Sequence, residues 1–516
     1  MHSTEAHPGS LKVSDKVSHR SGDRLGRSSA VAIGVLVVST LVVLMNEMAL
    51  GVALPHLMDD LGVTASTGQW LTTGYMLTMA VVIPTTAFLM QRFRLRAFFI
   101  AAMATFSVGT LIAASAPGFE MLFAGRIIQA AGTAVMMPLL LSTTMILVPP
   151  ARQGQIMGVV TVVIGGAPAF APALSGLVVD QLGWRWLFII ILPIALVCLA
   201  MGARMIRVVT DTRTVKLDAL SVALSALGFA ALVYGLSTFG ESAEGATPVA
   251  PWIPLTLGVV VIGLFVLRQT ALQRTDNALL DMRAFASKAF TASAAIMAFI
   301  TMTAFGVILV MPLILQESLG LSTLQAGLFM APGGAAIAIV SLIVGRCYDR
   351  VGPRPFVISG AVVVSASLWF MSTLGPGTSV WVYLAAHLVM CTGQSFVWTP
   401  AMATALGSLR AALIPHGSAI MNTIQQLAGA AGTAILISVL VASAATREQD
   451  GADTSTATAE GGQVAFMVGG VITLFAVVAS LFITRPVSSA TELTRLPEDA
   501  APVAEAPVGA DKPTVE

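Results

Sequence analysis

Fourteen long apolar stretches run through the chain and constrain its fold more than any other feature. A helix needs about 20 apolar residues to cross a bilayer, and only helices and closed barrels satisfy every backbone polar group inside lipid. The sequence therefore predicts an all-α polytopic membrane protein with 14 transmembrane helices. The predicted spans are residues 31–55, 68–90, 97–116, 119–148, 155–179, 184–206, 217–239, 251–268, 289–316, 323–346, 355–374, 379–405, 416–443 and 464–484.

The composition argues against a soluble enzyme and against a nucleic-acid-binding protein. Charged residues make up only 10% of the 516 residues, whereas soluble chains carry about 25%. The net charge of +1 supplies no strongly basic surface for nucleic acid. The three cysteines have neither disulfide nor zinc spacing, and the sequence has no Walker loop or GxSxG elbow. We therefore expect no cofactor, no metal and no enzymatic activity.

The positive residues predict how the chain is oriented. If the N-terminus is cytoplasmic, 24 of the 27 Lys and Arg residues fall in cytoplasmic segments. Such a bias is typical of loops that stay on the inner side of a membrane. The prediction is a multi-pass protein of the cell (plasma) membrane with both termini cytoplasmic. The three exceptions are Arg126, Arg185 and Arg447.

Two internal echoes indicate a duplicated architecture. The loops that begin at Gln91 and Asp349 both carry basic residues at matching offsets. Arg126 is followed six residues later by a glycine, and so is His387. Two related six-helix halves are the architecture of a transporter with a midplane site. The predicted domains are a disordered tail (1–28), an N-terminal six-helix bundle (29–207), two inserted helices (208–270), a C-terminal six-helix bundle (271–485) and a second disordered tail (486–516).

The second of these loops has the chemistry of a releasable latch. Asp349 can accept hydrogen bonds from the free N–H groups at the start of a neighbouring helix. Gln91 carries no charge, so its loop is expected to hold less firmly. The alternative is that the arginines of these loops only fix topology. The predicted cytoplasmic gate consists of Gln91, Arg92, Gly345, Asp349, Arg350, Gly352 and Arg354.

Three titratable residues inside the spans are candidates for proton coupling. Glu47 is the only acidic residue well inside a span, and Arg126 is the only such Lys or Arg. Both lie at a similar estimated depth, so an ion pair within roughly 6 Å is predicted for the deprotonated acid. His387 lies at a similar depth. The alternatives are a neutral Glu47 in a helix contact, an Arg126 that binds only carbonyls, and a His387 that only packs.

Seven motifs follow one another along the chain: NEMALGVALP (46–55), QWLTTGYM (69–76), GRIIQAAG (125–132), APAFAPALSG (167–176), WRWLF (184–188), GRCYDRVGPR (345–354) and HGSAIMNTIQQ (416–426). In these motifs the chain resembles the fourteen-helix drug:proton antiporters of the major facilitator superfamily, in the branch of the lincomycin-resistance-type exporters. The resemblance covers about residues 30–485. It departs from the superfamily pattern at Gln91, where Asp is usual, and at Glu47, where the acid is one residue later than in the family.

The resemblance implies proton-coupled export of hydrophobic or amphipathic drugs, including antibiotics, by alternating access. The expected partners are a small hydrophobic molecule, protons and lipid, and the expected state is a monomer. In the resembled family the motif with Pro168, Pro172 and Gly176 is tied to the direction of transport, and ordinary helix kinking is the alternative. The predicted pocket residues are Asn46, Trp70, Tyr75, Gln129, Phe305, Gln316, Asn422, Gln425 and Gln426.

Other functions remain open at this point. The closest alternatives are an exporter dedicated to one endogenous metabolite and import by symport. A membrane-embedded acyltransferase would need paired His/Asp or Ser/His groups at one membrane face, and the sequence offers none. A receptor or scaffold would not require a solitary intramembrane acid or repeated gate loops.

Overall fold

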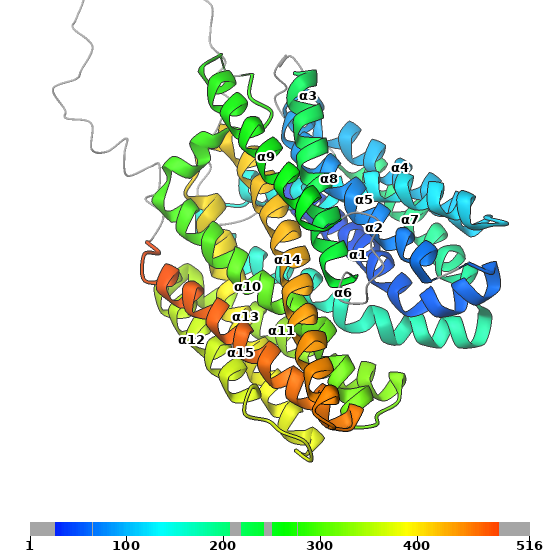
Figure 1. The fold of residues 1–516 in the computed structure, drawn as a ribbon. Helices are drawn as coiled ribbons and strands as arrows, with labels where there is room; N and C mark the ends of the chain where they lie inside the picture. The colour runs from blue at the N-terminus through cyan, green and yellow to red at the C-terminus, as the bar shows by residue number, and fades with distance from the viewer. Residues whose placement is uncertain (1–25, 64, 207–217, 242–249, 276, 485–516) are drawn as a thin grey trace, which may run out of the picture.

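A computed structural model of the chain describes residues 26–63, 65–206, 218–241, 250–275 and 277–484 (Figure 1). The described residues form helices joined by short connections, and no β-strand occurs among them. The predicted all-α class is therefore correct. The predicted tails, 1–28 and 486–516, lie outside the described residues except for residues 26–28.

Each of the fourteen predicted spans is helical. Within the described residues, 13 spans are long and apolar enough to cross a membrane. The remaining stretch is α6, which has 30 residues and is thus about 45 Å long. The helices are α1 (Arg27–Leu61), α2 (Ala65–Val82), α3 (Thr86–Arg92), α4 (Leu95–Ala114), α5 (Phe119–Leu147), α6 (Gln153–Leu182), α7 (Arg185–Met205), α8 (Ala219–Glu241), α9 (Trp252–Leu272), α10 (Lys288–Leu313), α11 (Thr323–Val351), α12 (Pro353–Met371), α13 (Val380–Gly407), α14 (Ile414–Gln449) and α15 (Thr454–Ser480).

Several helices are longer than the apolar stretches that predict them. The stretch 31–55 becomes a helix that ends only at Leu61, where Gly62 adopts a left-handed conformation with φ of 62°. The apolar pattern marks the part that lies in hydrocarbon, whereas the helix continues until a residue stops it. The second span is continuous from α2 through the short helix η1 (Ile83–Thr85) to α3, with Pro84 at the change of geometry.

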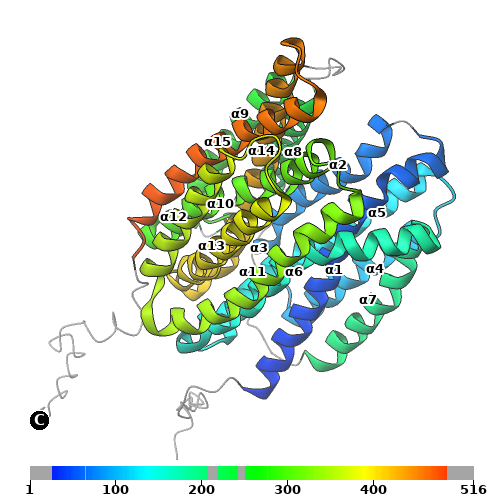
Figure 2. The ribbon, with the colours of Figure 1, turned by 90° about the horizontal axis from the view of Figure 1, so that it is seen from below.

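The helices form two groups, which meet where α6 packs on α11 (Figure 2). One group, called the N-half, contains α1 to α7, and its pairs α4–α5, α4–α7, α1–α6 and α2–α5 pack together. The other group, called the C-half, contains α10 to α15, with contacts between α10–α14, α12–α13, α12–α15 and α11–α13. In Figure 1 the blue-to-cyan N-half and the yellow-to-orange C-half lie on opposite sides. The predicted division into two six-helix bundles with two inserted helices is consistent with these contacts and stays a prediction.

The pair α8 and α9 lies between the halves along the chain and in space. The two helices pack on each other, and α8 also contacts α2 of the N-half and α14 of the C-half. Arg268 Nε lies 2.7 Å from Asp218 Oδ2, which ties the end of α9 to the start of α8. Arg268 donates hydrogen bonds to both carboxylate oxygens of Asp218, and these bonds hold the pKa of Asp218 well below its ordinary value.

Close-packed glycines repeat in the two halves. A Cβ at Gly132 would meet the backbone of Ala102 and Phe106, so α5 touches α4 there. A Cβ at Gly393 would meet the backbone of Gly360, so α13 touches α12 in the same way. The second sequence echo therefore corresponds to equivalent helix contacts.

An aspartate and a Trp-Arg pair join α1 to α7 at the side opposite the termini. Asp60 accepts hydrogen bonds from Trp184 Nε1 at 2.9 Å and from Arg185 Nη1 at 2.8 Å. The bonds from Trp184 and Arg185 lower the pKa of Asp60. This contact gives the WRWLF motif a structural role and places Arg185 at the far end of α1.

Candidate functional site

A cavity of about 1090 Å³ lies between the two halves. Its lining residues belong to α1, α2, α5 and α6 of the N-half and to α10, α11, α13 and α14 of the C-half, together with η1 and the π-helical turn η6 (Ile314–Ser318). Four corresponding helices of each half thus form the wall. The lining reaches His56 near the end of α1 and Gln316 after α10, which both lie toward the side opposite the termini.

Most of the cavity wall is apolar and deformable. Unbranched thioether side chains adapt to ligands of different shape, and six methionines contribute to this wall from both halves. Phe305, Trp398 and Tyr75 add aromatic surface. The methionines are Met48, Met76, Met79, Met137, Met330 and Met390.

The three predicted coupling residues all lie on the cavity wall. Glu47 and Arg126 belong to the N-half and His387 to the C-half. Arg126 is within electrostatic range of Glu47, but among the described residues no ion pair within 4.0 Å joins them. The direct pair therefore stays a prediction, whereas the shared cavity wall is a feature of the structure.

Hydrogen bonds to side chains of α1 and α5 hold Arg126 in place. Its Nη1 donates to Gln129 Oε1 at 2.6 Å and to Asn46 Oδ1 at 3.4 Å. Gln129 in turn donates to Thr110 Oγ1 on α4 at 2.8 Å. The guanidinium carbon lies 4.0 Å from the centre of the Tyr75 ring, in a cation–π contact. Asn46 and Gln129 thus lie behind the cavity wall and orient the arginine.

Amides and a His–Cys pair provide the polar groups of the C-half wall. Gln394, Asn422, Gln425 and Gln426 line the cavity from α13 and α14. His387 Nε2 lies 3.5 Å from Cys391 Sγ one turn along α13, and its Nδ1 is buried without a hydrogen-bond partner. This half of the wall therefore offers mainly neutral hydrogen-bonding groups.

The cavity is closed at the side where α1 begins and α15 ends, called here the termini side. There Asp349 Oδ1 accepts the N–H of Gly154 at 2.8 Å, and its Oδ2 accepts the N–H of Gln155 at 3.1 Å. These are free N–H groups at the start of α6, and they are the kind of partner that the sequence predicts for Asp349. A Cβ at Gly345 would meet the carbonyl oxygen of Gly154, so the backbones of α11 and α6 are in contact.

The other gate residues make different contacts. The amide nitrogen of Gln91 lies 2.7 Å from Nε2 of His416 in the C-half. Gly352 adopts φ of 90° between α11 and α12, a conformation that favours glycine. Arg354 Nε donates to the carbonyl oxygen of Ile483 at 3.1 Å and joins α12 to the end of the chain's last span. Arg92 and Arg350 are exposed.

Other predicted residues divide between the cavity and its surroundings. Tyr75, Phe305, Gln316, Asn422, Gln425 and Gln426 line the cavity. Trp70 is not among the described lining residues and instead stacks on Tyr234 of α8, with ring centres 6.1 Å apart. On α6, Gly176 lines the cavity. Pro168 and Pro172 also belong to α6, but their side chains lie outside the described part of the structure.

Sequence reasoning missed two sets of residues. The predicted pocket does not include the lining methionines or Gln394, although a glutamine within an apolar span is a visible signal. His416 belongs to one of the matching motifs but not to the predicted gate, yet it contacts the other half. In the part of the chain that the structure describes, no group of three or more His, Cys, Asp or Glu side chains could hold a metal ion.

The comparisons with known proteins agree with this geometry. Residues 36–433 match the family model described as Major Facilitator Superfamily. The chain belongs to this superfamily. Its members are transporters, which supports the prediction that this superfamily member is not an enzyme.

Several relatives of this superfamily member have names that refer to drug resistance. It is 36% identical to the lincomycin resistance protein LmrB of Listeria monocytogenes, over 86% of this chain and 94% of that protein. It is 29% identical to the multidrug resistance protein B homolog of Mycobacterium tuberculosis, over 81% of this chain and 77% of that protein. The human organic anion transporter MFSD10 (TETRAN) has the same fold, with a TM-score of 0.62 at 14% identity, covering 88% of this chain and 99% of that chain.

Proposed function

We propose that this transporter is a proton-coupled antiporter that exports hydrophobic or amphipathic drugs across the cell membrane by alternating access. The observation that carries the proposal is the position of Glu47 and Arg126 on the wall of a largely apolar cavity between the halves. A carboxyl group in such a place can carry a proton and can change its interaction with a nearby cation when it does so.

The size and chemistry of the cavity support drug-sized substrates. Pockets for such ligands are about 300–1,000 Å³ and mostly apolar, and this cavity has about 1090 Å³ with flexible methionines and neutral amides. The described lining residues include no dense ring of charges that would demand one ionic ligand. The names of the LmrB and multidrug resistance relatives point to the same substrate class.

The closed termini side supports alternating access. If the termini are cytoplasmic, as the positive residues predict, the described state is shut toward the cytoplasm by the Asp349 contact and has its cavity directed outward. In this state Glu47 would receive a proton from outside. Opening of the α6–α11 contact would then release the proton inside and admit substrate. The complete cavity within one chain supports a monomer as the working unit.

The decisive test is substrate-dependent proton movement in vesicles. The purified protein would be placed in liposomes that carry an outward-directed lincomycin gradient and an internal pH-sensitive dye, with empty liposomes and a protonophore as controls. The proposal predicts a lincomycin-dependent proton flux that the protonophore abolishes. A panel of unrelated amphipathic drugs would separate a multidrug exporter from an exporter dedicated to one compound. Transport of these compounds without any proton flux would contradict the coupling.

A further inference from the structure

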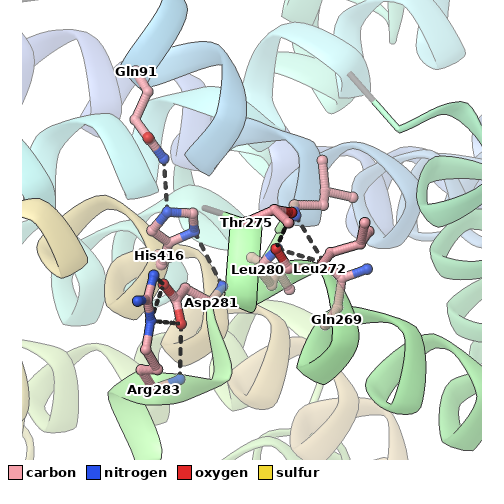
Figure 3. A network of polar contacts seen from close by, with 9 residues as sticks. Gln91, Gln269, Leu272, Thr275, Leu280, Asp281, Arg283 and His416 are labelled. Atoms are coloured by element: carbon pink, nitrogen blue, oxygen red, sulfur yellow. Dashed lines mark hydrogen bonds and ion pairs between the residues drawn. The ribbon is translucent and has the colours of Figure 1, made fainter. Parts of the chain in front are cut away.

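A second contact joins the halves at the termini side, away from the Asp349 latch. The amide nitrogen of Gln91, at the end of α3, lies 2.7 Å from Nε2 of His416 near the start of α14 (Figure 3). The other ring nitrogen, Nδ1, accepts the backbone N–H of Asp281 at 3.2 Å. The ring is buried, with 6% of the residue exposed. His416 therefore connects the N-half to the segment that leads into the C-half.

This contact is the counterpart of the Asp349 latch in the duplicated architecture. In the latch, the loop residue Asp349 binds the N–H groups of Gly154 and Gln155 at the start of α6. The offset that relates Arg126 to His387 also relates Gly154 and Gln155 to Pro415 and His416 of α14. Proline has no N–H to donate, and Gln91 has no negative charge. In this second contact Gln91 stands where the latch has Asp349, and the imidazole ring of His416 stands where the latch has the N–H groups of α6.

The surrounding hydrogen bonds define the form of His416 that fits. The N–H of Asp281 belongs to the backbone and cannot change from donor to acceptor, so Nδ1 must carry no hydrogen. A neutral ring then carries its hydrogen on Nε2. Gln91 can accept that hydrogen by turning its amide oxygen toward the ring, because the oxygen and nitrogen of an amide exchange places on rotation. A protonated ring would place a second hydrogen directly against the Asp281 N–H, so the ring has to turn away from that group and thereby leaves the position in which Nε2 meets Gln91.

The neighbouring charges leave this preference largely intact. The Asp281 carboxylate is buried and forms an ion pair with Arg283, with Oδ2 and Nη2 2.6 Å apart. Among the described residues, these are the two charged groups that act on the His416 ring, and their charges are opposite. Arg92, the basic neighbour of Gln91 on α3, is exposed to solvent, and so is Arg410 before α14.

The partner segment is itself anchored, so the ring cannot easily relax. Oε1 of Gln269 on α9 accepts the N–H groups of Leu279 at 2.7 Å and Leu280 at 3.2 Å, as Figure 3 shows. The amide of Gln269 also donates to Ser221 Oγ on α8 at 2.7 Å. The Asp281 N–H is therefore held against His416 from the side of the inserted helices.

We propose that His416 is a second proton-binding residue of the transport cycle, whose neutral form holds the Gln91 contact closed and whose protonated form releases it. The inference rests on the proposed alternating access, because the contact matters only if the termini side opens. If His416 has this role, a lower pH at the termini side directly favours opening of that side. The Asp349 latch would then supply a constant part of the closure, and the Gln91–His416 contact a part that depends on pH.

The test is a distance measurement at the termini side as a function of pH. Spin labels would be attached to Phe93→Cys and Ala411→Cys, which are exposed positions beyond α3 and before α14. The three native cysteines would be replaced by serine and the protein studied in nanodiscs between pH 8 and pH 5.5, around the ordinary histidine pKa of about 6.5. The population with the longer distance should rise roughly fivefold to tenfold on acidification, the effect expected for loss of about one hydrogen bond.

Three variants decide whether His416 causes the shift. His416→Gln should abolish the pH dependence, and Gln91→Ala should do the same from the partner side if the first variant folds poorly. Gln91→Asp should invert the dependence, because a carboxylate binds the protonated ring more strongly. A wild-type distance that does not change with pH, or an unchanged shift in His416→Gln and Gln91→Ala, would overturn the proposal.

Glu47→Gln separates this inference from the proposed coupling. If the shift persists in Glu47→Gln, it comes from the termini side and supports the role of His416. If the shift disappears in Glu47→Gln but persists in His416→Gln, the opening follows the cavity carboxyl group and the inference is wrong, while proton coupling gains support. A shift that depends on His416 in a protein that moves no protons in vesicles would support the inference and refute the coupling.

Discussion

Asp349 of the C-half and Gly154 of the N-half are joined by a hydrogen bond and by close packing of the backbone around Gly154. The Asp349 Oδ1 accepts the Gly154 N–H at 2.8 Å, and a Cβ at Gly154 would meet Oδ1 of Asp349, the Tyr348 ring and the Gly345 carbonyl oxygen. The charged hydrogen bond thus depends on a backbone approach that only glycines allow. The hydrogen bonds of Asp349 and the close approach of α6 and α11 therefore both act where the termini side is closed.

Asp349→Asn should shift the population toward states open at the termini side. The variant keeps one acceptor oxygen but loses the charge and one of two hydrogen bonds to the α6 N-terminus. A hydrogen bond to a charged group contributes about 1.5–3 kcal/mol, so a change of at least about tenfold is expected. Labelling of an engineered cysteine on the termini side would measure it. Asp450→Asn, at an exposed aspartate after α14, is the matched control and should not change labelling.

Gly345→Ala should prevent full closure by steric means. The new methyl group would meet the Gly154 carbonyl and force α11 away from α6. We expect the same opening as in Asp349→Asn but without any charge change. Gly34→Ala serves as the control, because a Cβ there has nothing within 4 Å. Equal labelling in both glycine variants would show that this backbone contact does not limit closure.

Glu47→Gln should abolish proton-driven export while the protein remains folded. Glutamine has nearly the same shape but cannot exchange a proton. Vesicle transport against a concentration gradient should fall to background, whereas downhill exchange of substrate should continue. Asp59→Asn, at an exposed aspartate on the same helix, should transport like the wild type. Uphill transport at wild-type rate by Glu47→Gln would show that another group carries the proton.

Gln129→Leu should disturb Arg126 without touching the cavity wall. The variant removes the acceptor that lies 2.6 Å from Nη1 of Arg126 and its link to Thr110. Because a buried cation would lose its closest hydrogen bond, proton-coupled transport should fall about tenfold or more. The pH profile of transport should also move. Gln129→Glu, which keeps an acceptor oxygen, should retain more activity than Gln129→Leu, and the reverse order would contradict this role of Gln129.

Asp218→Asn should lower thermal stability in a pH-dependent way. The hydrogen bonds from Arg268 lower the pKa of Asp218 in the folded protein, so the ion pair stabilises the fold above the ordinary aspartate pKa of about 3.9. That contribution is lost as the pH falls through the lowered pKa. Melting curves of wild type and variant should differ between pH 5 and pH 8 and converge in strong acid. A constant difference at all pH values would exclude the ion pair as its cause.

The helices could be predicted because membrane crossing imposes a simple rule on sequence. Long apolar stretches locate every span, and the echo between Arg126 and His387 predicts the equivalent contacts at Gly132 and Gly393. The Asp349 contact was also foreseeable, because a carboxylate near a tight turn has few partners other than a helix N-terminus. In each of these cases a feature within one short segment of sequence is enough to determine the helix or the contact.

The cavity wall could be predicted only in part, since it depends on the rotation of each helix. Trp70 and Tyr75 lie five residues apart in one motif, yet one faces α8 and the other the cavity. The wall methionines cannot be told from lipid-facing ones by type. His416 was missed for another reason: its partners Gln91 and Asp281 are distant in sequence, and only the folded chain brings them together.

The inserted helices have a mechanical consequence for the cycle. Since α8 contacts both α2 and α14, any relative rotation of the halves must be taken up at one of these two surfaces. Gln269 fixes the segment leading into α10, so the α14 side is the stiffer attachment. On the α2 side the rings of Trp70 and Tyr234 are stacked with an interplanar angle of 24°, and stacked ring faces can slide past each other. The α8–α9 pair would then move together with the C-half, and the relative movement of the halves would take place at the stacked rings of Trp70 and Tyr234.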